Sequence, residues 1–191
     1  EVRYRMTSDP LFVHCCHCRW CQRETGSAFA VNAMIEADRV VLLQGEVEAI
    51  TIPSASGKGQ KISRCPRCRI ALWSNYAGAG DAVRFVRVGT LDEPGRLPPD
   101  VHIFTSTKQP WVVLPAGVPA VPEYYSAKAH WPAASLQRRE ALFAAIGRGS
   151  SADHRGCGDC AGHPHHRICQ QCCHRERRDA CDRRAGCSHG F

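Results

Sequence analysis

The chain has 191 residues, and 43% of them are hydrophobic, which suits one domain or one domain with an appendage. Its formal net charge is +7, yet residues 1–148 carry 18 Lys and Arg against 13 Asp and Glu, with no block of like charge. A nucleic-acid groove would need basic residues interleaved with stacking aromatics, which are not seen here, so we expect no nucleic-acid partner. A general preference for anionic small molecules explains the modest positive charge as well.

The sequence has no apolar run of membrane-spanning length and no visible signal peptide. We therefore expect a cytoplasmic protein without a membrane partner. In that compartment thiols stay reduced, so the 13 cysteines indicate metal binding rather than a disulfide scaffold.

Short strand patterns bounded by turn residues follow one another from the N-terminus and predict a mostly β, antiparallel fold. The expected strands are Val2–Met6, Leu11–His14, Ala28–Ile35, Val40–Gln44, Val47–Ile52, Lys61–Arg64, Ile70–Ser74, Val83–Val88 and Val101–Thr105. One C-terminal helix is expected over Ala134–Ile146, because an apolar stripe recurs there at helical spacing and Gly147 follows it.

Three cysteines follow the second expected strand with the spacing C-x-C-x-x-C, at Cys16, Cys18 and Cys21. Such close spacing strains disulfides among the three, but it lets three thiolates converge on one zinc ion. Three ligands leave one tetrahedral position open, as in catalytic zinc sites. The alternative is a closed structural site with a fourth ligand from Cys15 or from a distant cysteine pair.

A second cysteine pair has the form of a zinc knuckle, Cys65-Pro66-Arg67-Cys68. A knuckle supplies two of the four ligands of a structural zinc site. Residues 1–148 offer no further cysteine pair, so this sequence shows half of such a site.

Other residues near these motifs have less specific patterns. His14 and His17 are either ligands or proton shuttles, or, as is more common, hydrogen-bonded neighbours of a knuckle. His102 alternates with apolar residues. It either faces a cleft or is a strand histidine whose ring nitrogens are hydrogen-bonded within the fold. Three tryptophans are expected in the core rather than in a pocket wall: Trp20, Trp73 and Trp111.

Residues 149–191 differ sharply from the rest of the chain. They hold seven of the 13 cysteines, six of the ten histidines and seven arginines, and their only large apolar residues are Ile168 and Phe191. Too little surface can be buried to offset the entropy of ordering, so we expect disorder or an out-of-frame reading of a GC-rich gene. The weaker alternative is a second zinc module built from Cys157-x-x-Cys160 and Cys169-x-x-Cys172.

Several motifs occur in an order that resembles the glutathione-dependent formaldehyde-activating enzyme family, which includes centromere protein V domains. They are C-H-C-R-W-C-Q-R-E-T-G-S-A-F at Cys16–Phe29, R-C-P-R-C at Arg64–Cys68, V-G-T-L-D-E-P at Val88–Pro94, V-H-I-F at Val101–Phe104, and Trp111. The resemblance covers roughly residues 1–146.

The resemblance implies a fold of folded antiparallel sheets, called Mss-four-like, with zinc knuckles and one C-terminal helix. It implies a catalytic zinc on Cys16, Cys18 and Cys21. It also implies a structural zinc on Cys65 and Cys68, completed by an early C-x-C pair. Val2-Arg3-Tyr4 resembles the segment directly after that pair, so we expect the N-terminal edge of this domain, residues 1–148, to be truncated.

The resemblance further implies a carbon–sulfur lyase that forms or cleaves S-hydroxymethylglutathione, or acts on a related thiol adduct, with glutathione as substrate. Arg23 and Arg64 lie beside the cysteine motifs and are candidates for holding the carboxylates of glutathione. His17 is the candidate acid–base residue. The alternative is a zinc-stabilised binding module without catalysis, as the centromere protein V relatives suggest.

Overall fold

The computed structural model describes the backbone of residues 1–152 and the side chains of residues 1–147. Residues Glu1–Ala145 form one compact unit, and a second unit begins at Ile146. The expectations for the cysteine-rich tail, including its two possible knuckles, concern residues outside those described.

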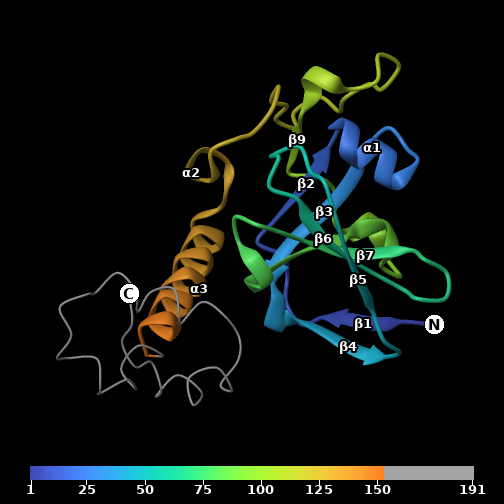
Figure 1. Ribbon diagram of the computed structural model, residues 1–191. Helices are drawn as coiled ribbons and strands as arrows, with labels where there is room; N and C mark the ends of the chain where they lie inside the picture. Colours follow the sequence, from blue (N-terminus) through green and yellow to red (C-terminus); the bar gives the residue numbers. More distant parts are fainter. Residues whose placement is uncertain (153–191) are drawn as a thin grey trace, which may run out of the picture. The chain divides into compact units, whose positions relative to one another are not determined.

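Nine strands confirm a mostly β fold, and seven of them form one sheet in the order β5-β6-β7-β8-β3-β2-β9 (Figure 1). The bounds are β2 Phe12–Cys16, β3 Ala30–Glu36, β5 Glu48–Ile52, β6 Gln60–Arg64, β7 Ala71–Tyr76, β8 Val83–Arg87 and β9 Val101–Ile103. Neighbouring strands are antiparallel except β2 and β9, which are parallel, with Cys16 opposite Ile103. The expectation of purely antiparallel sheets is therefore wrong at this pair, because a long irregular connection before β9 returns the chain in the direction of β2.

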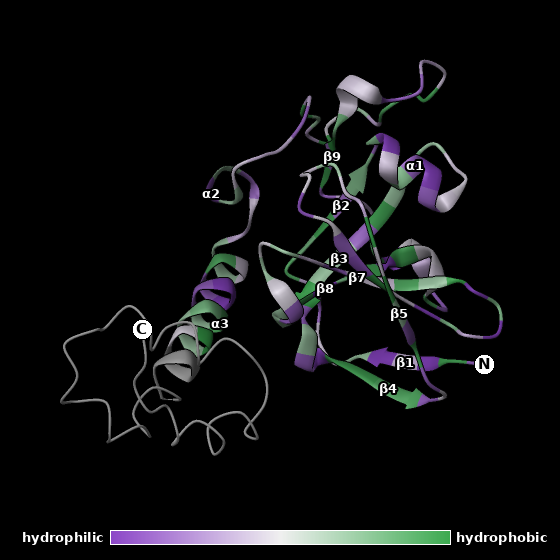
Figure 2. Ribbon diagram, in the orientation of Figure 1, coloured by the Kyte–Doolittle hydropathy of each residue, from purple (hydrophilic) through white to green (hydrophobic). Residues whose placement is uncertain are grey.

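A separate two-stranded sheet pairs β1, Arg3–Met6, with β4, Val40–Gln44. β4 is coloured as hydrophobic along most of its length in Figure 2, up to Gln44 at its end. Val40 is buried and packs in the core, whereas Val41, Leu42 and Leu43 are partly exposed. Tyr4 and Met6 of β1 pack against the same cluster as Val40, so this small sheet covers part of the core.

Two helices precede the one that the sequence predicts. The first is α1, Arg19–Thr25, which begins at Cys18, whose sulfur accepts a hydrogen bond from the backbone N–H of Cys21 at 3.4 Å. It ends at Gly26, whose φ of 62° is left-handed and therefore suits glycine. The second is the short α2, Ala127–His130.

The expected C-terminal helix is α3, Ala133–Ala152, but it continues through Gly147 instead of ending there. A glycine inside a helix costs only about 1 kcal/mol relative to alanine, so it need not stop the helix. No helix in the described part of the chain has both the length and the hydrophobicity needed to cross a membrane.

The core consists of two clusters that share β2 between them. All five residues of β2 are buried; Phe12 and Cys16 belong to one cluster and Val13 to the other, as alternation along a strand requires. Trp73 is buried as predicted, and Trp20 is half-buried. Trp111 is 72% exposed, so its expected place in the core is wrong.

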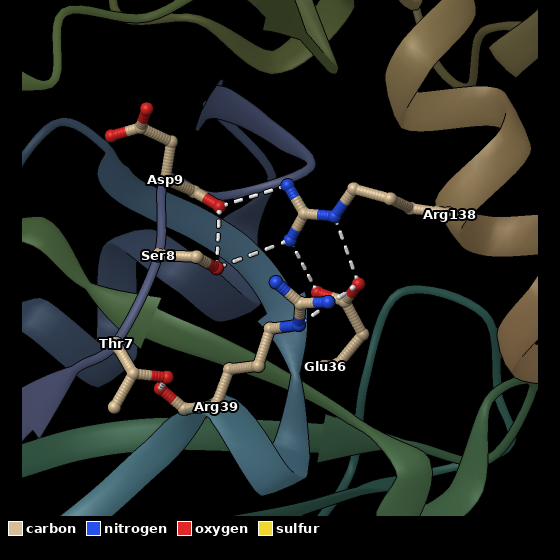
Figure 3. A network of polar contacts seen from close by, with 6 residues as sticks. All are labelled: Thr7, Ser8, Asp9, Glu36, Arg39 and Arg138. Carbon is tan, nitrogen blue, oxygen red and sulfur yellow. Dashed lines mark hydrogen bonds and ion pairs between the residues drawn. The ribbon is translucent and has the colours of Figure 1, made fainter.

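An ion pair ties α3 to the end of β3 (Figure 3). Nε and Nη2 of Arg138 donate to the two carboxylate oxygens of Glu36 at 3.0 and 2.6 Å, and Arg138 also donates to Ser8 and to the carbonyl of Asp9. Burial raises the pKa of Glu36, but the hydrogen bonds and charges of Arg138 and Arg39 bring it below its ordinary value. The arrangement favours the ionised carboxylate.

Candidate metal centre

The structure brings Cys16, Cys18 and Cys21 together, and we call them the cysteine trio. Cys16 ends β2, Cys18 caps α1 and Cys21 lies in the first turn of that helix. Their three sulfur atoms lie within 4.8 Å of one another, and all three side chains are buried. The sulfurs converge because the chain passes from β2 into α1 within the six residues from Cys16 to Cys21.

The three thiols cannot all ionise without a cation. Hydrogen bonds from Cys16 and Cys21 lower the pKa of Cys18 to about 2. Donation to its neighbours raises the pKa of Cys16. A hydrogen bond from Cys16 lowers the pKa of Cys21, but donation to Cys18 and burial outweigh it and raise the value to about 12. The opposed directions mean that protein groups alone do not favour ionisation of all three thiols, whereas a divalent cation bound by the three sulfurs would displace their protons.

A buried arginine supplies positive charge near the trio. Arg87 is 6% exposed, donates to Asn32 Oδ1, and donates to Ser74 Oγ at 3.2 Å. Among the described residues no carboxylate pairs with it. Its charge acts to lower the pKa of Cys21. Zinc with three thiolates has a net charge of −1, so the sulfur donors and this guanidinium together fit a zinc ion.

The trio forms part of the wall of a cavity of ≈ 530 Å³. Most of the remaining wall is aromatic or small. Its residues are His14, Trp20, Asn32, Met34, Ser54, Ala55, Ser56, Lys58, Gln60, Tyr76, Ala77, Gly78, Phe85, Ile103, Phe104, Tyr124, Tyr125, Ala127, Trp131 and Arg139, besides the trio. We call it the thiol cavity. Its volume lies within the range of small-molecule sites.

Two polar side chains of the thiol cavity are suited to contact a ligand. His14 is 7% exposed, and its Nδ1 is buried with no hydrogen-bond partner in the described chain. Burial, followed by the charge of Arg87, lowers the pKa of His14 to about 4, so the ring is neutral. Burial and nearby sulfur charges raise the pKa of Tyr76, so its hydroxyl keeps its proton and can donate.

The cations of the thiol cavity are not those that the sequence indicated. Lys58 and Arg139 line it, and both are exposed. Arg23 is exposed and lies over the ring of Trp20 at 5.5 Å, outside the cavity wall. Arg64 pairs with Glu24 and lines a separate cavity of ≈ 440 Å³. No local pattern in the sequence brings residues 58 and 139 to the trio, because only the fold does so.

His17 also lies away from the thiol cavity. It is fully buried, and its Nε2 lies 3.0 Å from Nδ1 of His102 and 3.6 Å from the sulfur of Cys15. Cys15 therefore belongs to this second group rather than to the cysteine trio. An acid–base role for His17 stays a prediction, because the residue does not contribute to the wall that carries the trio.

The predicted knuckle is a turn next to the N-terminal strand. Cys65 is buried, whereas Cys68 is exposed and lines the same separate cavity as Arg64. Backbone N–H groups of Cys68 and Arg67, with a smaller contribution from Val2, lower the pKa of Cys65 to about 7. The described residues place no third ligand beside this pair. The contribution of Val2 shows that the start of the chain lies against the knuckle.

The model of the glutathione-dependent formaldehyde-activating enzyme family matches residues 1–107. This range contains the cysteine trio, the knuckle, and the second group formed by Cys15, His17 and His102. A crystal structure of a Rhodobacter sphaeroides protein is similar at 15% sequence identity with a TM-score of 0.35. The alignment covers 48% of this chain and 78% of that chain. The comparison with curated proteins gave no match.

Proposed function

The chain belongs to the glutathione-dependent formaldehyde-activating enzyme family, and on that premise we propose that it is a carbon–sulfur lyase acting on a glutathione–aldehyde adduct. The reaction would form or cleave S-hydroxymethylglutathione or a related thiol adduct. One observation carries the proposal: the cysteine trio lies in the wall of a cavity large enough for a small molecule.

Cys16, Cys18 and Cys21 would hold a zinc ion and leave one coordination position facing the cavity. Bound there, zinc would lower the pKa of a substrate thiol and polarise an aldehyde oxygen. An ordinary thiol titrates near ~8.5, so its deprotonation at neutral pH costs about 2 kcal/mol, an amount that a metal can supply. Arg87 would stabilise the net negative charge of the occupied trio.

The remaining walls would orient the substrate. Lys58 and Arg139 are exposed cations without an ion-pair partner in the described chain, and we assign them to the two carboxylates of glutathione. The Tyr76 hydroxyl would donate a hydrogen bond to the adduct oxygen. The unpartnered Nδ1 of His14 would hydrogen-bond a polar group of the substrate. Aromatic residues such as Trp131 would exclude water.

The proposal extends to the fold and to the second zinc site. We propose that residues 1–148 form one Mss-four-like domain and that Cys65 and Cys68 are half of its structural zinc site. The backbone of Val2 beside Cys65 supports this, because residues joined ahead of Val2 would start next to the knuckle.

The test measures glutathione binding and adduct exchange with the zinc-loaded full chain. Calorimetry gives the dissociation constant for glutathione. Carbon-13 exchange spectroscopy with labelled formaldehyde gives the rate at which free and sulfur-bound carbon interconvert. We expect catalysed exchange in the parent and its loss, by 100-fold or more, in Cys18→Ser.

Cys68→Ser is the matched control, because it also removes one cysteine but from outside the thiol cavity. It should keep the exchange rate of the parent. A folded Cys18→Ser variant that binds glutathione and catalyses exchange as the parent does would contradict the proposal. A folded parent that carries zinc but neither binds glutathione nor accelerates exchange would favour the binding-module alternative.

A further inference from the structure

A second group of metal-ligating side chains lies apart from the cysteine trio, and we call it the Cys–His–His group. It consists of Cys15 of β2, His17 in the turn after β2, and His102 of β9. One ligand atom from each lies within 4.8 Å of the others. The residues are 1%, 0% and 6% exposed, so the group is enclosed by protein.

The parallel pairing of β2 with β9 creates the group. In that pairing Cys15 lies opposite His102, and the backbone N–H of His17 donates to the carbonyl of Ile103 at 3.0 Å. Successive strand residues point to opposite faces, so Cys15 points away from the thiol cavity that Cys16 lines. None of the three residues lines a described cavity. The group is therefore a separate place in the molecule.

Hydrogen bonding alone satisfies the group poorly. A neutral imidazole nitrogen has either one proton or one lone pair, so Nε2 of His17 can form one good hydrogen bond. It nevertheless has two neighbours, at 3.0 Å on His102 and 3.6 Å on Cys15. Nδ1 of His17 and Nε2 of His102, the other nitrogen of each ring, have no partner in the described chain, so each can carry the ring proton while the nitrogen that faces the group keeps its lone pair.

The distances suit a shared metal ion. Zinc binds sulfur at about 2.3 Å and histidine nitrogen at about 2.05 Å, so tetrahedral ligands lie about 3.6 Å apart for sulfur and nitrogen and about 3.3 Å apart for two nitrogens. The observed separations are 3.6 and 3.0 Å. One thiolate and two imidazoles form a donor set of borderline softness, which zinc and copper accept.

We propose that Cys15, His17 and His102 form a second, enclosed zinc site that is independent of the cysteine trio. This site lies on the other face of β2 and joins that strand to β9. Three protein donors leave one position for a solvent molecule. None of the three described cavities includes these residues, so we assign the ion a structural role, in which it links strands that are distant in the sequence. The inference goes beyond the proposed reaction and does not depend on it.

The test measures the metal content of the full chain, purified without a metal-binding tag or a chelator. Zinc and copper per chain are determined after expression in zinc-supplemented medium. All variants keep the same tail, so any metal bound there cancels in the comparison. We expect Cys15→Ser and His102→Gln each to lose about one equivalent of zinc relative to the parent. Cys18→Ser combined with His102→Gln should lose about two.

His130→Gln is the matched control, because it removes one histidine outside both groups and should keep the metal content of the parent. Parent-like zinc content in folded Cys15→Ser and His102→Gln would overturn the proposal, and copper in place of zinc would overturn the assignment of the metal. If these variants do not fold, crystals of the parent decide. An anomalous peak at the zinc edge between Cys15 and the two rings supports the site, and its absence beside a peak at the trio refutes it.

Discussion

Two guanidinium nitrogens of Arg138 on α3 donate hydrogen bonds to the carboxylate of Glu36 at the end of β3, and this carboxylate is almost completely buried. Removing one member of a buried ion pair leaves the other without compensation. We expect Glu36→Gln to lower the free energy of unfolding by roughly 2 kcal/mol at pH 7, less than for a fully enclosed pair because Arg138 is partly exposed. Urea unfolding followed by circular dichroism measures it.

The same pair predicts how stability depends on pH. The pKa of Glu36 lies below its ordinary value of 4.5 in the folded protein, so its stabilising contribution is present above 4.5. The contribution is lost as the pH falls through the folded pKa. The gap between parent and Glu36→Gln should therefore shrink on acidification below pH 4.5. A gap that stays constant or widens there would show that the carboxylate is not the group responsible.

Replacement of Arg87 should weaken metal binding at the cysteine trio. Arg87→Met removes the buried positive charge that favours the trio in its ionised form, and we expect zinc affinity to fall about 10-fold. Competition with a chromophoric chelator measures this in the full chain. Arg84→Met is the control, because Arg84 stacks on Trp73 at 4.6 Å and, unlike Arg87, does not act on the pKa of a trio cysteine. Equal losses in both variants would count against a specific role for Arg87.

The two proposed carboxylate-binding cations can be distinguished from the two that the sequence indicated. Lys58→Gln and Arg139→Gln should each raise the dissociation constant for glutathione about 3- to 5-fold, since an exposed charge pair is worth up to about 1 kcal/mol. Arg23→Gln and Arg64→Gln should leave it within about 2-fold, because neither side chain lines the thiol cavity. The reverse pattern would restore the original assignment.

Tyr76→Phe tests the hydrogen bond proposed for the adduct oxygen. Loss of a donor to a charged oxygen costs about 1.5 kcal/mol, so adduct exchange should slow roughly 10-fold with little change in glutathione affinity. Tyr4→Phe serves as the control, because the Tyr4 hydroxyl pairs with Thr90 at 2.6 Å instead of lining the thiol cavity. An unchanged exchange rate in Tyr76→Phe would remove Tyr76 from the proposed site.

A Cys-x-Cys segment joined ahead of Glu1 should complete the proposed structural zinc site, since Val2 already lies against Cys65. We expect the melting temperature in zinc-containing buffer to rise by about 5 °C or more, because metal that binds the folded state stabilises it. A Ser-x-Ser extension controls for added length. The rise should disappear with Cys68→Ser, and a rise that survives this change would have another origin.

The strands and the cysteine trio were accessible to sequence reasoning because their signals are local. Alternation and turn residues mark the strands, and a six-residue motif, Cys16–Cys21, holds all three sulfurs of the trio. The helix α1 was missed although its ends are marked, since a cysteine sulfur at Cys18 takes the place of an ordinary cap and Gly26 ends it. With only seven residues, it also presents no apolar stripe.

Features that depend on tertiary pairing had no local signal. The partner of His17 lies 85 residues away on β9, and the parallel register that joins them follows from the path of the chain. Arg23 and Arg64 were chosen as carboxylate-binding residues because they lie beside the cysteine motifs in the sequence, whereas the fold brings Lys58 and Arg139 to the cavity wall. Periodicity describes a single element, so it cannot rank contacts between distant ones.

The sulfur of Cys18 both starts α1 and belongs to the trio. Binding of the proposed zinc ion and ordering of the segment from Arg19 to Thr25 are therefore expected to be thermodynamically linked, each promoting the other. Stripping the ion should speed amide hydrogen exchange selectively in that segment while distant strands keep their protection. Removal of the proposed ion would then loosen one short segment of the chain and leave the sheet intact.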